Sequence, residues 1–146
     1  MTGSASSIWR SVVSRAFLKT QAVLPVVLVQ GWHAGSGGEH AEQLASWSSR
    51  IASQLGRPAV VAHGLDAWGT PQDNAGALRA AVAAAASSTP AGMVDVLAYD
   101  AGAFTVREML ERFGAQQVRR VVFVASPHGG WTFADDLYST LVTQAA

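Results

Sequence analysis

The chain has 146 residues, of which 49% are hydrophobic and 14% charged, and ten basic residues balance ten acidic ones. A chain of this length fits one domain with a sizeable core. The balanced charge gives no electrostatic footprint for a nucleic acid. No apolar run approaches the roughly 18 residues of a membrane span. The absence of cysteine excludes disulfides and thiolate chemistry.

Residues 1–22 differ from the rest, because they are rich in serine and carry Arg10, Arg15 and Lys19 without any acidic residue. We interpret them as an N-terminal helix, or alternatively as a targeting segment. We therefore expect a cytoplasmic protein, with a mitochondrial or other organellar location as the alternative. Residues 23–146 are expected to form the core domain.

Short β-branched runs alternate with amphipathic segments along the core domain. The runs predict strands at 24–29, 58–62, 93–98 and 120–125. The amphipathic segments predict helices at 39–55, 73–87, 105–113 and, shorter, 133–143. Strands separated by helices of this length form right-handed crossovers and a parallel sheet. The predicted fold class is α/β, a three-layer sandwich around a mainly parallel sheet of about four strands.

The third predicted strand runs into the next helix through the segment Ala98-Tyr-Asp-Ala-Gly102. Its small residues at both ends match the nucleophile elbow, G-x-S-x-G, in which strand and helix backbones approach closely. The central residue of such an elbow adopts a left-handed conformation, which Asp tolerates better than most residues. We therefore expect Asp100 at positive φ, with its side chain above the carboxyl end of the sheet.

Three segments in order resemble the α/β-hydrolase superfamily, and more closely its lipase and esterase branches. They are Pro25-Val-Val-Leu-Val-Gln-Gly31, Val94-Asp-Val-Leu-Ala-Tyr-Asp-Ala-Gly102, and Val118-Arg-Arg-Val-Val-Phe-Val-Ala-Ser-Pro-His-Gly129. The resemblance implies the strand order second, first, third, fourth, and hydrolysis of an ester or a small apolar electrophile.

The sequence also departs from that family pattern. Gln30 stands where the family has histidine, Ala98 replaces the first elbow glycine, and Asp100 replaces the nucleophilic serine. The resemblance ends after the fourth strand. We therefore expect the later strands, which carry the family's catalytic acid and histidine, to be missing from this sequence, so that no conventional Ser–His–Asp triad can form.

Some branches of the superfamily place Asp at the elbow, where its carboxylate forms a covalent ester that water then hydrolyses. The resemblance assigns Asp100 as nucleophile, His33 or His128 as general base, and the N–H groups of Trp32 and Ala101 as oxyanion donors. Gly31 and Gln30 complete the predicted site. No metal ligands and no cofactor are expected, because the four histidines match no metal-binding spacing.

An alternative role for Asp100, and with it an alternative function for the chain, stays open. Asp100 would be the N-cap of the following helix rather than a nucleophile, and the chain would then be a catalytically silent binding or scaffold module. In either case the fourth strand is predicted to form an uncovered edge of the sheet. We expect such an edge to pair in a homodimer, or to be covered by a C-terminal segment.

Overall fold

The computed structural model describes residues 23–31, 39–66, 68–130 and 132. Four parallel strands form one sheet in the order β2-β1-β3-β4. They are β1 (Val26–Gln30), β2 (Ala59–Val61), β3 (Val94–Tyr99) and β4 (Val118–Val124). The predicted fold class and strand order are both confirmed. The predicted segments 1–22 and 133–143 lie outside the described residues.

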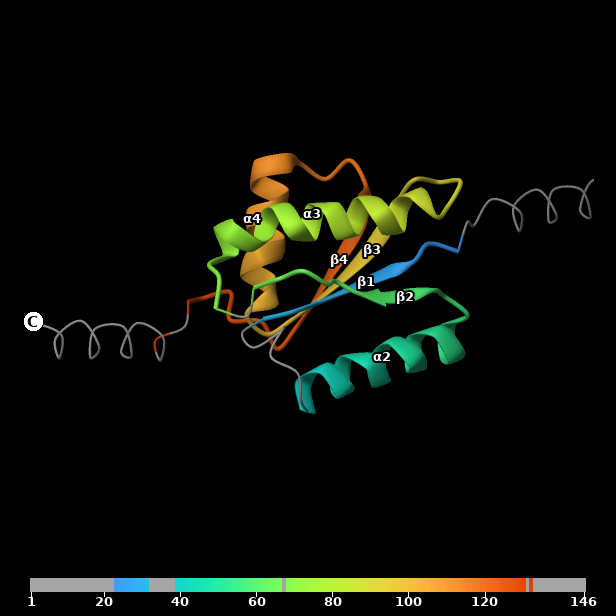
Figure 1. Cartoon of the computed structure of the whole chain (residues 1–146), viewed down its shortest axis with the longest axis horizontal. Coiled ribbons are helices and arrows are strands. Elements are labelled where there is room, and N and C mark those ends of the chain that lie inside the picture. The colour runs from blue at the N-terminus through green and yellow to red at the C-terminus, as the bar shows by residue number, and fades with distance from the viewer. Residues whose placement is uncertain (1–22, 32–38, 67, 131, 133–146) are drawn as a thin grey trace, which may run out of the picture.

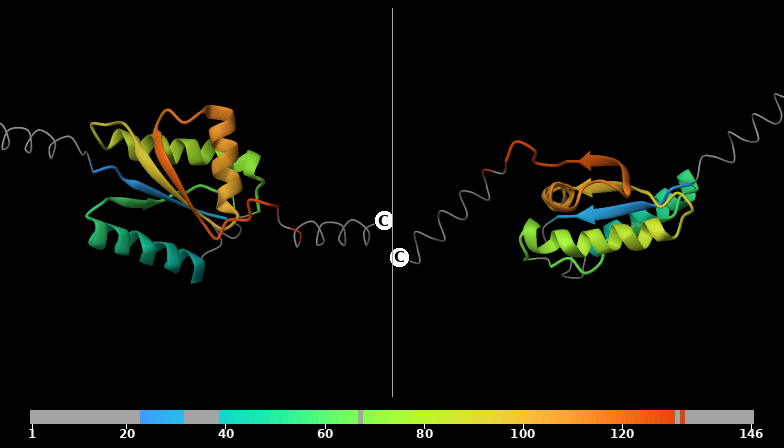
Figure 2. Two further views of the ribbon diagram at one scale, coloured as in Figure 1. Left: turned by 180° about the vertical axis from the view of Figure 1, so that it is seen from behind. Right: turned by 90° about the horizontal axis from the view of Figure 1, so that it is seen from above.

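The helices are α2 (Glu39–Leu55), α3 (Pro71–Ser87) and α4 (Gly102–Phe113). In Figure 1, α2 lies on one face of the sheet, and α3 and α4 lie on the other. The view from above in Figure 2 looks onto the face of the sheet that α3 and α4 cover. Within the described part of the chain, none of the helices combines the length and the hydrophobicity needed to cross a bilayer.

The core divides into two clusters, one on each face of the sheet. The larger cluster joins α3 and α4 to alternate residues of the central strands, among them Val27, Val29 and Val96. The smaller cluster joins Leu44 of α2 to Val26 and Leu28 of β1. All five residues of β1 are buried, as a central strand covered on both faces requires.

Two helices begin earlier than the sequence predicted, and local hydrogen bonds explain both starts. Thr70 and Asp73 form a reciprocal capping box, and Pro71 occupies the first helical position, so α3 begins at residue 71 rather than 73. At the start of α4, the N–H groups of Ala103 and Phe104 donate to the carbonyls of Asp100 and Ala101. These bonds lead the chain directly from strand to helix, so α4 begins at Gly102 rather than at residue 105.

Candidate functional site

The carboxyl end of β3 passes into α4 at Asp100, which has φ of 52°. Its left-handed backbone was predicted and is observed. Its N–H donates to the carbonyl of Val124 at 3.0 Å, so the turn is fixed to the end of β4. The alternative that Asp100 caps α4 is wrong, because Ala101 is the N-cap residue and no side-chain capping bond is formed. Among the described residues, no hydrogen bond or ion pair reaches the Asp100 carboxylate.

The backbones of β1 and α4 approach so closely that glycine is required on both sides. A Cβ atom added to Gly31 would lie 2.6 Å from the backbone nitrogen of Ala101. One added to Gly102 would lie 2.7 Å from the carbonyl oxygen of Val29. The fold therefore brings the predicted residues Gly31 and Ala101 together. Among the described residues, no acceptor lies on the N–H of Ala101, so this donor is available to a ligand.

Gln30 lies at the carboxyl end of β1 and pairs in the ladder with Tyr99. Only 6% of the residue is exposed, and its Oε1 has no hydrogen-bond partner among the described residues. On the same side of the sheet, the ring of Tyr99 meets that of Trp47 edge-on at 5.0 Å. A buried acceptor without a partner is uncommon, and at a functional site it indicates a group that a ligand could satisfy.

The end of β4 contributes a second strained residue that the sequence did not reveal. Ala125 has φ of 50°, and it directly follows the Val124 carbonyl that binds Asp100. Non-glycine residues at positive φ cost of order 1–3 kcal/mol and gather at functional sites. Alanine has no preference for this conformation, so nothing in its identity signals it. The carboxyl ends of β3 and β4 thus carry both non-glycine residues with positive φ in the described chain.

The structure does not join the described histidines to Asp100. His128 follows β4, is exposed, and its ring packs edge-on against Phe123 at 4.5 Å. His63 follows β2 and is also exposed. Trp32 and His33 lie outside the described residues, so their predicted roles stay predictions. No group of three or more acidic or histidine residues is arranged for a metal ion in the ranges described.

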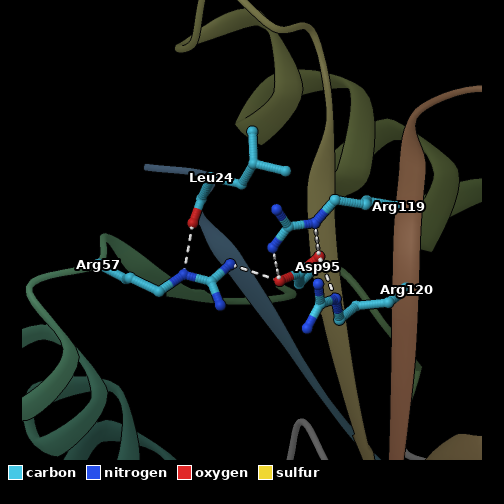
Figure 3. Close-up of polar contacts among 5 residues, drawn as sticks. All are labelled: Leu24, Arg57, Asp95, Arg119 and Arg120. Atoms are coloured by element: carbon cyan, nitrogen blue, oxygen red, sulfur yellow. Dashed lines mark hydrogen bonds and ion pairs between the residues drawn. The ribbon is translucent and has the colours of Figure 1, made fainter. Parts of the chain in front are cut away.

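A second polar cluster lies at the amino end of the sheet, away from Asp100. Asp95 is 3% exposed and accepts hydrogen bonds from Nε and Nη2 of Arg119, at 2.9 and 2.6 Å, and from Nη2 of Arg57 at 2.7 Å. Arg120 lies 3.7 Å from the same carboxylate. Figure 3 shows the three guanidinium groups converging on Asp95, while Nε of Arg57 also donates to the carbonyl of Leu24. This cluster connects β3 and β4 with the segments that precede β1 and β2.

The same cluster sets the protonation of Asp95. Burial alone would raise the pKa of its carboxyl group, but the hydrogen bonds from Arg119 and Arg57 outweigh burial and hold the pKa below its usual value. The carboxylate is therefore ionised and fully occupied by arginines. It acts as a structural anchor, unlike Asp100, whose carboxylate has no described partner.

Comparisons with known proteins agree with this arrangement at the level of the fold. No protein-family model and no curated protein sequence matches the chain. Among solved structures, the chain is similar to lipase 1 from Pelosinus fermentans, with a TM-score of 0.54 and 17% sequence identity. The match covers 81% of this chain and 45% of the lipase chain, so this chain spans less than half of the lipase's length. The likeness shows a lipase-like α/β fold.

Proposed function

We propose that this α/β-hydrolase-like protein is of the lipase/esterase type, and that it hydrolyses an ester or a small apolar electrophile with Asp100 as the nucleophile. One observation carries the proposal: Asp100 is held at φ of 52° while its carboxylate makes no described hydrogen bond or ion pair. A residue that is strained and has no structural partner is best explained by a role toward a ligand.

In the proposed reaction, a carboxylate oxygen of Asp100 attacks the electrophilic carbon of the substrate, and the leaving group departs with its electron pair. An alkyl electrophile gives an Asp100 ester, and an ester substrate gives a mixed anhydride. Water then attacks the carbonyl carbon of the Asp100 adduct, after a histidine has taken its proton. His33 and His128 are the candidates for this base.

The tetrahedral intermediate places negative charge on an oxygen beside the start of α4. The N–H of Ala101 is the described donor that could stabilise this charge, and the N–H of Trp32 is the second donor implied by the family resemblance. The positive end of the α4 dipole also favours an anion at this position. Gln30 lies close to the same turn through the contact of its backbone with Gly102. We propose that its unpartnered Oε1 contacts the substrate.

A substrate assay with three variants tests the nucleophile. We expect wild type to cleave short p-nitrophenyl esters or a small epoxide, and Asp100→Asn to abolish that turnover. Asn tolerates the same backbone conformation, so the fold should be retained. Asp100→Ser should show ester turnover if the oxyanion donors are in place. Glu111→Gln is the matched control, because Glu111 is exposed on α4 and has no described partner.

Isotope labelling separates a nucleophile from a general base. After a single turnover of a small epoxide in H₂¹⁸O, a nucleophilic Asp100 incorporates ¹⁸O into its own carboxylate, because water attacks the carbonyl carbon of the Asp100 ester, and mass spectrometry of the peptide containing Asp100 detects the label. A general base would leave that peptide unlabelled. Unlabelled Asp100 after turnover of the epoxide, or undiminished activity in Asp100→Asn, would contradict the assignment.

A second function, a catalytically silent binding module, is favoured by a different observation. Both histidines whose side chains are described, His63 and His128, are exposed, and neither forms a hydrogen bond or an ion pair with Asp100. Without a base the Asp100 adduct would not be hydrolysed. Such a module would bind small apolar esters without turnover, and Asp100→Asn would change the affinity and not a rate. Isothermal titration with a non-hydrolysable ester analogue, combined with the turnover assay, distinguishes the two functions, because binding without turnover supports the silent module.

A further inference from the structure

β4 forms one edge of the sheet among the described strands, and it is longer than the strand at the opposite edge. Among the described strands, in the order β2-β1-β3-β4, it pairs only with β3. It has seven residues, whereas β2 at the opposite edge has three. Proteins keep exposed edges short, or interrupt them with charge and proline, because unpaired backbone groups attract another strand. The segment from Val121 to Val124 carries neither device.

One hydrogen bond fixes which backbone groups of β4 face outward. The Val124 carbonyl accepts from the N–H of Asp100, so the polar groups of Val124 point toward β3. In a strand these directions alternate along the chain. Val122 therefore also bonds toward β3, and the N–H and C=O groups of Val121 and Phe123 point away from the sheet. These two residues present the groups that a further strand would bind.

Apolar side chains surround these outward groups. Val122 is 48% exposed and Phe123 is 37% exposed. The two arginines of the strand lie together at its amino end, where both contact Asp95. On the two faces, α4 packs over β1 and β3, and α2 packs against β1 and β2. In both views of Figure 2, β4 forms the border of the sheet. The described helices therefore leave space beside this strand.

We propose that β4 pairs with β4 of a second copy of this chain, in an antiparallel arrangement about a twofold axis at Val122. This register pairs each Val121 with Phe123 of the second copy, as two hydrogen-bonded pairs that use the outward groups. Val122 lies opposite Val122 of the second copy. Arg120 lies opposite Val124 of the second copy. The two sheets then form one continuous sheet.

The charge pattern selects a second copy in this register. Because both arginines lie at the amino end of β4, the antiparallel arrangement separates the arginines of the two copies and leaves the centre apolar. A parallel in-register arrangement would place like charges directly opposite one another, which is destabilising. The twofold contact is also closed, so it yields a dimer and no open filament.

A charge exchange at Val122 tests both the edge and the register. Val122→Lys and Val122→Glu each place like charges across the proposed axis, and the half-exposed site lets the monomer fold. We expect sedimentation equilibrium to show a wild-type dimer, a dissociation constant raised at least about tenfold in each variant, and recovery of a heterodimer when the two are mixed. Circular dichroism checks that each variant is folded.

Val60→Lys is the matched control, because Val60 is similarly exposed at 42%. It should leave the dimer unchanged, because Val60 lies on β2 at the opposite edge of the sheet. A monomeric wild type would overturn the proposal, since the edge would then be covered by another part of the chain or would take a different partner. Dimers of undiminished affinity in both Val122 variants would also overturn it. Weakened variants whose mixture does not associate would exclude the proposed axis.

Discussion

Substitution of Asp95 by Asn tests whether the arginine cluster at the amino end of the sheet anchors the fold. Asn keeps the shape of the side chain and removes its charge. The three guanidinium groups would then converge on a neutral amide, which cannot accept the bidentate contact that Arg119 makes with both carboxylate oxygens. The variant isolates the ionic part of the cluster with little change in packing.

The magnitude follows from the burial of the partners. Breaking a buried ion pair by removing one partner costs about 3–5 kcal/mol. Asp95 is buried, but the side chains of Arg119 and Arg120 are 40% and 63% exposed, so water screens part of the interaction. We therefore expect Asp95→Asn to lower the free energy of unfolding by about 2–3 kcal/mol. For a chain of this length, the melting temperature would fall by about 10 °C.

The loss should depend on pH with a definite sign. The pKa of Asp95 is lowered in the folded state, so its carboxylate stabilises the fold fully above the unfolded pKa of about 3.9. That contribution is lost as the pH falls through the lower pKa of the folded state. The gap in stability between wild type and Asp95→Asn should thus be constant from neutral pH down to about pH 5 and should narrow below about pH 4.

Urea denaturation followed by circular dichroism at several pH values measures this gap. Glu111→Gln provides the control, because it also removes one negative charge, but from an exposed position without a described partner. The reasoning is refuted if Asp95→Asn unfolds within about 0.5 kcal/mol of wild type at neutral pH. It is also refuted if the gap stays constant on acidification.

Three further substitutions test the carboxyl end of the sheet by the same denaturation assay. Gly102→Ala should destabilise by about 1–3 kcal/mol, because its Cβ would overlap the backbone of β1; its control Gly76→Ala, in open space on α3, should stabilise by about 0.5–1 kcal/mol. Gln30→Met should raise stability by about 1 kcal/mol by removing the unpartnered buried Oε1; a decrease would mean that this oxygen has a partner outside the described residues. Asp100→Gly should raise stability by up to about 1 kcal/mol through relief of positive φ, and a loss of that size would reveal a structural partner for the carboxylate.

Much of the fold was predictable because its signals are local. The β-branched runs and the amphipathic segments predict all four described strands and all three described helices, and α2 has the predicted bounds. The start of β4 was predicted two residues late. Val118 and Arg119 were left out of the predicted strand, whereas in the structure they belong to it, and Asp95 accepts hydrogen bonds from the guanidinium group of Arg119. A contact between distant segments cannot be seen in a local pattern.

Within the candidate site, the features that backbone packing constrains could be predicted from the sequence. Gly31 and Gly102 have no space for a Cβ atom, and the left-handed backbone of Asp100 follows from the same close approach. The prediction that Asp100 caps α4 was wrong. It rested on the general preference for Asp at the N-cap of a helix, whereas here α4 follows β3 directly and Ala101 is the N-cap residue. Ala125 was missed for the opposite reason, since its conformation is imposed by the chain around it and not by its own side chain.

The two ends of the sheet therefore differ in whether their polar and strained residues stabilise the fold. At the amino end, one buried carboxylate accepts hydrogen bonds from two arginines, forms an ion pair with a third, and connects segments far apart in the sequence. At the carboxyl end, two residues adopt costly conformations and a buried amide oxygen has no described partner. If these residues had been selected only for stability, we would not expect two strained backbones and an unpartnered buried oxygen to lie together at the carboxyl end of the sheet. If this contrast reflects function, substitutions at Asp95 should reduce stability, and those at Asp100 and Gln30 should raise it while they remove binding or turnover.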